Sequence, residues 1–419
     1  MNRPRARIGF ISTRFAGTDG VSLETAKWAA VLEALGHTCF YFAGECDRPP
    51  DRSYVVPEAH FAHPDIEALT LDLFDNLVRF PTTSVQVQTI KDLLKDHLRR
   101  FVGMYRPNLL IVENALALPV HVPLGLAITE FIAETNLPVI GHHHDFVWER
   151  ERFAINGAAD YIHAAFPATL DSIRHVVINS VAARQLARRK GVGSVIVPNV
   201  MDFDRPPPAP DAHSATLRET LGIRSDEALL LQPTRIVPRK KIEHAIEIVR
   251  RLGLPAVLLI SHAAGDEGMA YEQYLREFAG LIGARVLFAG DWVDHERDEA
   301  NGEPRFSLAD VYSQCDLVTY PSVIEGFGNA FLETVYYRRP IMMANYEIFN
   351  HDIRPKGFRA ITFSEYVEEP ALQKAREWLA NPSLVAEIVA ENYEIARRYF
   401  SYTVLLKHLE VLVNDCLGA

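Results

Sequence analysis

The stretch RIGFISTRFAGTDGVSLETAKWAAVLEALGHTCFYFAG, residues 7–44, decides the fold class. It begins with a short apolar segment (7–12), passes through a glycine-containing loop, and enters a segment of helical composition that stops at Gly36. A second apolar segment, TCFYFAG (38–44), follows directly. A strand, a crossover helix and a second strand form a βαβ unit, and such units place their strands in a parallel sheet.

The same alternation continues beyond residue 44 and restarts after residue 212. Further strands are predicted at 108–114, 137–141, 176–180 and 195–199, and then at 228–236, 256–262, 284–293, 316–322 and 340–345. Helical segments lie between most of them, and from about residue 371 the chain is helical without intervening strands. We therefore predict an α/β protein with two doubly wound parallel sheets.

A proline-rich run separates the two series of strands. DRPPPAPDA (204–212) cannot continue a helix or a central strand, so it is the predicted hinge. The predicted Rossmann-like domains are 1–203 and 213–385, and a helix at about 386–419 is expected to pack back onto the first domain. Ligands of such sheets bind outside the carboxyl ends of the strands, so we expect the site in the interdomain cleft.

Composition restricts the classes of function. The chain has 419 residues, 48% of them hydrophobic, and a net charge of −11, which argues against non-specific nucleic-acid binding. Its four cysteines form no CxxC pair, as is typical of a reducing compartment. No run of about 18 apolar residues suggests an integral membrane segment. We expect a cytoplasmic protein.

Two acids flank a glycine-rich loop at the end of a predicted strand. Glu325 and Glu333 surround Gly326-Phe327-Gly328, directly after the apolar run 316–322. Such acids can form an acid/base pair, ligate a metal, bind ligand hydroxyls, or only offset a helix dipole. The backbone N–H groups at the start of the following helix favour a phosphate or another polar ligand group.

A cationic segment follows the first strand of the second series. Four of the eight residues 234–241 are Arg or Lys in an otherwise acidic protein. Arg235 and Lys240 can converge on one dianion, the first as a bidentate fork and the second as a point charge. The alternative is a solvated basic loop, but the position after a buried strand favours phosphate binding.

A histidine run ends the strand at 137–141. His142, His143, His144 and Asp145 could form a metal site, but no further ligand cluster has convincing spacing. One histidine acting as a hydrogen-bond donor, with the others structural, is the favoured interpretation. The loop GTDGVS (17–22) lacks the full GxGxxG pattern, so it does not predict dinucleotide binding.

Together these segments resemble the retaining glycosyltransferases of family 4, which have the GT-B fold. The resemblance is carried by PTRIVPRKKIEHAIEIV (233–249), DLVTYPSVIEGFGNAFLE (316–333) and VIVPNVMDFD (195–204). Glu325 and Glu333 match the E-x7-E signature of that family, and Arg235 and Lys240 match its Arg-x4-Lys pair. His144 and Asp145 match its His-Asp motif in the first domain.

The resemblance implies a role for each matching residue. Arg235 and Lys240 would hold the diphosphate of a nucleotide sugar, and His144 would reach the donor sugar from the first domain. Glu325 would bind hydroxyls of the sugar and Glu333 the ribose. The implied catalytic residues are His144, Arg235, Lys240 and Glu325. The implied donor-binding residues are Gly20, Arg235, Lys240, Val293, Glu325, Gly326, Phe327, Gly328, Asn329 and Glu333.

Several segments depart from the family pattern. ANYEIFNHDIRPKGF (344–358) replaces a loop of small residues, Val200 stands where the family has glycine, and the acidic stretch 292–306 is expected to overhang the nucleotide base. The charged HHHDFVWERER (142–152) would suit a small polar or anionic acceptor, through Trp148, Arg150 and Arg152. The expected acceptor-binding residues are Asp19, Asp145, Trp148 and Arg150.

The expected function is transfer of a hexosyl group, with retention, from a UDP- or GDP-sugar to a hydroxyl of a small acceptor. The resemblance implies no metal and no cofactor other than the nucleotide sugar. A sugar-nucleotide epimerase and a catalytically silent nucleotide-sugar-binding protein remain open alternatives on the same fold. A glycosidase is disfavoured because it needs no diphosphate clamp. Whether the protein is a monomer or a homodimer is open.

Overall fold

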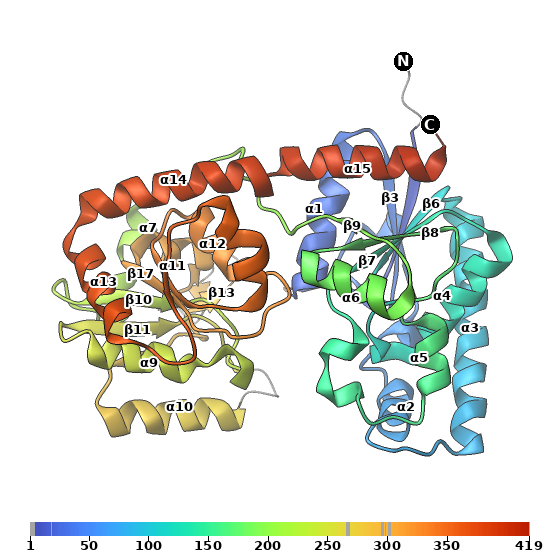
Figure 1. Cartoon of the computed structure of the whole chain (residues 1–419), viewed down its shortest axis with the longest axis horizontal. Helices are drawn as coiled ribbons and strands as arrows, with labels where there is room; N and C mark the ends of the chain where they lie inside the picture. The colour runs from blue at the N-terminus through green and yellow to red at the C-terminus, as the bar shows by residue number, and fades with distance from the viewer. Residues whose placement is uncertain are drawn as a thin grey trace. The chain divides into compact units, whose positions relative to one another are not determined.

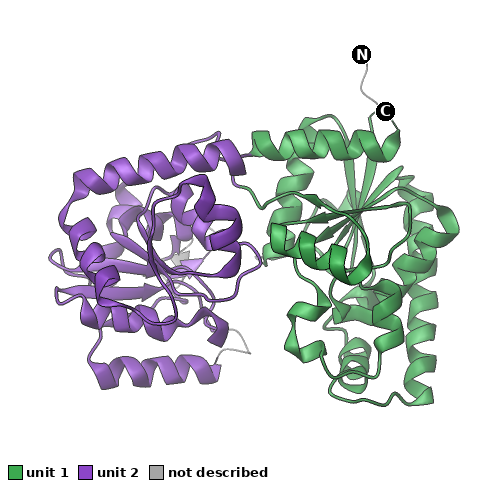
Figure 2. Cartoon of the chain, in the orientation of Figure 1, with its two compact units in different colours: residues 1–200, 402–419 green, residues 201–401 purple. Residues whose placement is uncertain are grey.

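The computed structural model describes residues 5–17, 19–264, 269–294, 297, 299–300 and 303–418. The chain folds into two compact units, shown in different colours in Figure 2. Unit 1 consists of residues 1–200 and 402–419, and unit 2 of residues 201–401. The proline-rich segment 204–212 therefore belongs with unit 2.

Unit 1 contains a seven-stranded parallel sheet in the order β5-β3-β1-β6-β7-β8-β9 (Figure 1). The strands are β1 (Arg7–Ile11), β3 (Thr38–Ala43), β5 (Ser53–Val55), β6 (Leu109–Glu113), β7 (Val139–His143), β8 (Ile173–Val177) and β9 (Val195–Ile196). In chain order, β3 and β5 are added on one side of β1, and β6 to β9 are then added on its other side. The carboxyl ends of β1 and β6 therefore form the topological switch point, where doubly wound sheets bind ligands.

Helices cover both faces of this sheet. They are α1 (Gly20–Ala34), α2 (Pro64–Leu73), α3 (Pro81–Tyr105), α4 (Val122–Thr135), α5 (Ala159–Ala165), α6 (Ser180–Lys190) and α15 (Tyr402–Leu417). On one face, Trp28 of α1 and Leu405 of α15 share a core with Phe10 and Tyr41. On the other, α3 and α4 pack on Ile11, Phe40 and Phe42. Apolar residues on both faces of the strands explain their nearly continuous hydrophobic sequence.

Unit 2 contains a six-stranded parallel sheet in the order β12-β11-β10-β17-β18-β19. Its strands are β10 (Ala228–Gln232), β11 (Ala256–Ile260), β12 (Val286–Phe288), β17 (Leu317–Tyr320), β18 (Ile341–Ala344) and β19 (Ile361–Phe363). Its helices are α7 (Ala212–Ala215), α8 (Leu217–Thr220), α9 (Ile242–Arg251), α10 (Met269–Ile282), α11 (Leu308–Gln314), α12 (Asn329–Tyr336), α13 (Glu369–Ala380) and α14 (Pro382–Phe400). The switch point of this unit lies between β10 and β17.

The predicted α/β class with two doubly wound parallel sheets is confirmed. The C-terminal helix expected at 386–419 is wrong in detail, because the segment forms two helices and only α15 belongs to unit 1. Ser401 is extended between them, and the Met201 amide donates a hydrogen bond to the Phe400 carbonyl, which holds the end of α14 to unit 2. No helix among the described residues combines the length and apolar character needed to cross a bilayer.

Candidate active site

The first cluster of polar side chains lies at the switch point of unit 2. Buried side chains connect the carboxyl ends of the two central strands: Thr319 of β17 donates to the Gln232 side chain at 2.9 Å, and Gln232 donates to Thr234 at 2.8 Å. The loops after β10 and β17 therefore leave the sheet from fixed positions. One carries the predicted cations and the other the predicted acids.

Lys240 and Glu325 form a buried ion pair between these two loops. Lys240 is 8% exposed, and the guanidinium of Arg239 lies 3.8 Å from the same carboxylate. Burial alone would raise the pKa of Glu325, but Lys240, together with Ser322 and Arg239, outweighs burial and the pKa is lowered. Lys240 and Glu325, which were both predicted to lie at the donor site, are thus in contact, and the glutamate is ionised.

The N-terminus of α12, at Asn329, lies a short glycine-containing loop beyond Glu325. Gly328 has a φ of 109°, a conformation that favours glycine, and a Cβ at this position would overlap the hydroxyl of Tyr346. That hydroxyl donates a hydrogen bond to the Phe327 carbonyl at 2.9 Å. The Gly326–Asn329 segment is therefore held in one conformation at the positive end of a helix dipole.

Three further residues predicted to bind the donor, Glu333, Arg235 and Val293, also belong to unit 2. Glu333 is on α12 and accepts a hydrogen bond from Tyr312 at 3.4 Å. The Arg235 side chain is exposed after β10. Val293 is in the short strand β13 (Val293–Asp294), which pairs with β16 (Phe306–Ser307). Within the stretch 292–306, residues 295, 296, 298, 301 and 302 lie outside the described part of the chain.

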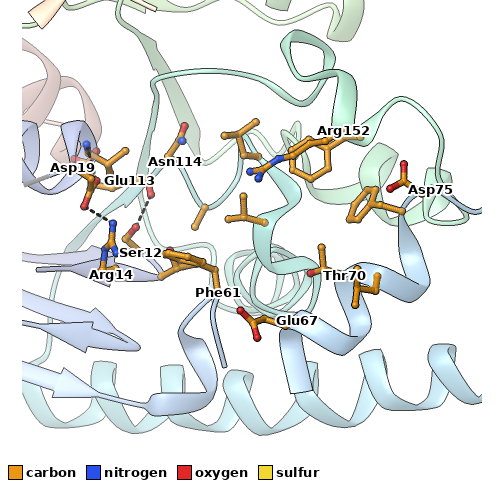
Figure 3. A pocket seen from close by; sticks show the side chains of 18 residues that line it. Ser12, Arg14, Asp19, Phe61, Glu67, Thr70, Asp75, Glu113, Asn114 and Arg152 are labelled. Carbon is orange, nitrogen blue, oxygen red and sulfur yellow. Dashed lines mark hydrogen bonds and ion pairs between the residues drawn. The ribbon is translucent and has the colours of Figure 1, made fainter. Parts of the chain in front are cut away.

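Unit 1 carries a pocket of about 660 Å³ at its own switch point. Figure 3 shows Ser12, Asp19, Glu113 and Asn114 at one end of it, Asp75 at the other, and Arg152 between them. Ser12 follows β1, and Glu113 ends β6, so the sheet order itself brings these residues together. Apolar side chains form much of the remaining wall, as is usual for small-molecule sites.

The predicted acceptor-binding residues are distributed unequally about this pocket. Asp19 lines it and caps α1, accepting hydrogen bonds from the Val21 and Ser22 amides at 3.0 and 3.1 Å. The amides at the start of α1, next to Gly20, therefore already donate hydrogen bonds to the Asp19 carboxylate. Asp145, Trp148 and Arg150 are not among the described residues that form the wall.

Asp145, Trp148 and Arg150 have other partners. Arg150 forms an ion pair with Asp145, its Nε lying 3.1 Å from the carboxylate. The indole of Trp148 donates to Gln185 at 2.6 Å. Arg152 is the member of the charged segment 142–152 that does line the pocket.

The three histidines have different environments. His142 and His143 are buried, whereas His144 retains 8% exposure. His143 bonds His175 at 2.9 Å, while His142 and His144 face Glu113. Glu113 was not predicted as a site residue; its only signal in the sequence was an acid within an otherwise apolar strand.

Glu113, His142 and His144 also form the group that could hold a metal ion among the described residues. One ligand atom from each lies within 4.8 Å of the others. Hydrogen bonds account for the same arrangement, because Oε2 of Glu113 lies 2.9 Å from Nδ1 of His142 and 3.3 Å from Nε2 of His144.

Two doubly wound units, each with polar residues at its strand ends, have the architecture of the GT-B fold. Comparisons with known proteins agree. The chain is 31% identical to the mannosylglucosylglycerate synthase of Thermotoga maritima, over 97% of this chain and 99% of that protein. No family model matches the chain. The chain belongs to the family-4 type of glycosyltransferases, together with this synthase.

Solved structures support the fold at low sequence identity. Sucrose-phosphate synthase from Thermosynechococcus elongatus superposes with a TM-score of 0.69 at 15% identity, covering 99% of this chain and all of that one. HepE from Anabaena, solved with UDP-glucose, gives a TM-score of 0.65 at 13% identity over 98% of this chain and 100% of that chain. The predicted GT-B fold and the predicted glycosyltransferase class are confirmed.

Proposed function

We propose that this glycosyltransferase moves a mannosyl group from a nucleoside-diphosphate sugar to a hydroxyl of glucosylglycerate or a closely similar acidic glycoside. Unit 2 binds the donor and unit 1 binds the acceptor. The full-length similarity to mannosylglucosylglycerate synthase supports the choice of substrates. The assignment of donor binding to unit 2 rests on the Lys240–Glu325 pair beside the α12 N-terminus.

Unit 2 supplies stabilisation of the leaving diphosphate. Lys240 and the exposed Arg235 would face the phosphates, and the positive end of the α12 dipole adds to them. Glu325, kept ionised by Lys240, would accept hydrogen bonds from sugar hydroxyls, and Glu333 from the ribose. We propose that the transfer retains configuration, as the family resemblance implies. It needs no metal, because the fixed cations and helix amides neutralise the developing charge.

Unit 1 supplies two cations for an acidic glycoside, on a pocket wall that also carries Asp19, Glu67, Asp75 and Glu113. Arg152 places a cation on the pocket wall for a carboxylate, and Arg14 adds a second that is shared with Asp19 at 3.0 Å. Ser12, Asn114 and Thr70 provide neutral hydrogen-bonding groups for sugar hydroxyls. A pocket of about 660 Å³ falls within the usual range for sites that hold small ligands.

Nucleoside diphosphates are expected to stabilise the protein against heat. A ligand at 100 times its Kd adds about 2.7 kcal/mol to the free energy of unfolding, which gives a rise of several degrees in Tm. Thermal unfolding with UDP, GDP and ADP measures this shift and identifies the base. If none of the three raises Tm, the assignment of unit 2 as a donor site is wrong.

Arg152→Gln is expected to raise KM for the acidic acceptor by about 10- to 100-fold, because one charged hydrogen bond to the ligand is lost. The KM for the donor should stay within about twofold. Steady-state kinetics with each substrate varied in turn checks both values. Arg150→Gln is the matched variant, since Arg150 pairs with Asp145 away from the pocket wall; a larger effect there than at Arg152 would reverse the assignment.

A further inference from the structure

Two neighbouring strands bring Glu113, His142 and His144 together. In the parallel register of β6 and β7, Glu113 lies opposite His142. Residues two apart in an extended segment point to the same side, so His144 follows His142 onto the same carboxylate. The rings of His142 and His144 have centroids 4.4 Å apart, and Trp28 stacks on His142 at 4.1 Å.

The carboxylate determines where the protons of both histidines lie. Burial would raise the pKa of Glu113, but the two histidines lower it to about 2, so the group is ionised and accepts hydrogen bonds only. His142 must therefore carry a proton on Nδ1 and His144 a proton on Nε2. For His144, this leaves Nδ1 as the nitrogen on the side away from Glu113.

Hydrogen bonding explains the cluster better than a bound metal does. A histidine that ligates a metal normally donates its other N–H to a partner. Nε2 of His142 is buried and has no hydrogen-bond partner in the described structure. If His142 bound a metal through Nδ1, its proton would lie on Nε2, which would be a buried N–H donor without an acceptor. If His142 instead donates Nδ1–H to Glu113, Nε2 carries only a lone pair. Buried acceptors without a partner are more common in proteins than buried donors without one.

The same strand end also forms the acceptor pocket. Glu113 and Asn114 are part of its wall, and Ser12, another wall residue, donates a hydrogen bond to the Glu113 carbonyl at 3.0 Å. The Asn114 side chain accepts a hydrogen bond from the His144 amide at 3.0 Å. Both the backbone and the ring of His144 are thus fixed by two consecutive residues of the pocket wall.

We propose that Glu113 is a positioning residue for glycosyl transfer. It holds the His144 ring with Nε2 toward the carboxylate and Nδ1 on the opposite side, and it connects this ring to the wall of the acceptor pocket. This inference rests on the proposed function, with His144 reaching the donor sugar as the family resemblance implies. Glu113 acts through His144 rather than on the substrates. Other charged groups near His144 are Glu24, which is paired with Lys27, and Asp145, which is paired with Arg150.

The test compares the wild-type protein with Glu113→Gln and with the matched control His143→Gln. His143 is a buried neighbour on β7 that bonds His175 instead of Glu113. Glu113→Gln is expected to lower kcat by about 100-fold, as small misplacements of catalytic groups do, with the KM for both substrates within about threefold. His143→Gln should retain kcat within about threefold. Normal kcat in Glu113→Gln, with only a lower Tm, would show a structural role and overturn the proposal.

Nitrogen-15 spectra of labelled histidines test the geometry without any activity. The His144 signals, identified by their loss in His144→Gln, should show the Nε2–H tautomer in the neutral wild-type protein. The midpoint of the His144 titration should move to lower pH in Glu113→Gln, because removing the carboxylate destabilises the imidazolium. A neutral Nδ1–H tautomer, or one equivalent of metal in the purified protein, would overturn the proposal even if Glu113→Gln fails to fold. Failure of the proposed function alone would leave these spectra unchanged.

Discussion

Lys240→Ala is expected to lower kcat by about 10²- to 10³-fold. Lys240 is the buried cation beside the α12 N-terminus, and the loss of one preorganised group that stabilises leaving-group charge has an effect of that size. The substitution also leaves Glu325 buried without its main counterion, so the free energy of unfolding should fall by about 3 kcal/mol. Steady-state kinetics and denaturant unfolding measure the two effects separately.

Two comparisons isolate the role of Lys240. Lys241→Ala removes the adjacent cation, whose side chain is 45% exposed and 3.9 Å from Glu243, and should leave kcat within about twofold. In the double variant Lys240→Ala/Glu325→Ala, stability should recover part of the loss, because neither charge is left unpaired, while kcat stays low. A Lys240→Ala protein that folds and turns over normally would refute the donor-site assignment.

Gly328→Ala is expected to lower the free energy of unfolding by about 2–4 kcal/mol and to reduce kcat strongly. A side chain at φ 109° is strained, and its Cβ would push against the Tyr346 hydroxyl that holds the Phe327 carbonyl. The Gly326–Asn329 segment would move away from its position at the head of α12. Denaturant unfolding and steady-state measurement of kcat check both consequences.

Gly253→Ala is the control for strain alone. Gly253 also has a positive φ, 68°, but a Cβ there meets no atom within 4 Å. Gly253→Ala should therefore lower the free energy of unfolding by only about 1 kcal/mol and leave kcat unchanged. If Gly253→Ala and Gly328→Ala lower the free energy of unfolding and kcat equally, contact with Tyr346 does not determine the conformation of the donor site.

Much of the fold follows from local sequence patterns. Strands buried on both faces, such as Leu109–Glu113, are recognisable as short apolar runs, and their alternation with helices predicts parallel sheets. Helix α3 was not predicted, although Val87, Leu94, Leu98 and Phe101 recur along its 25 residues at the spacing of an amphipathic helix. Edge strand β19 has three residues, too few for a clear pattern.

The proposed donor and acceptor sites differ in how far sequence could predict them. Most of the proposed donor-binding residues lie in two contiguous motifs, and Lys240 of one motif forms an ion pair with Glu325 of the other, a contact that the sequence did not predict. The acceptor pocket depends on strand order, which brings Ser12 next to Glu113 across about 100 residues of chain. Arg150 could not be separated from Arg152 by sequence alone, because the ion pair with Asp145 exists only in the folded loop.

Acceptor-dependent release of nucleoside diphosphate tests the central claim most directly. The purified protein is incubated with mannose and glucose donors of GDP, UDP and ADP, with and without glucosylglycerate, and the products are examined by mass spectrometry and NMR. We predict one added hexose per nucleoside diphosphate released, with the α configuration of the donor retained and the reaction dependent on the acceptor. Equal release without acceptor, or no glycosylated product with any donor, would contradict the proposed function.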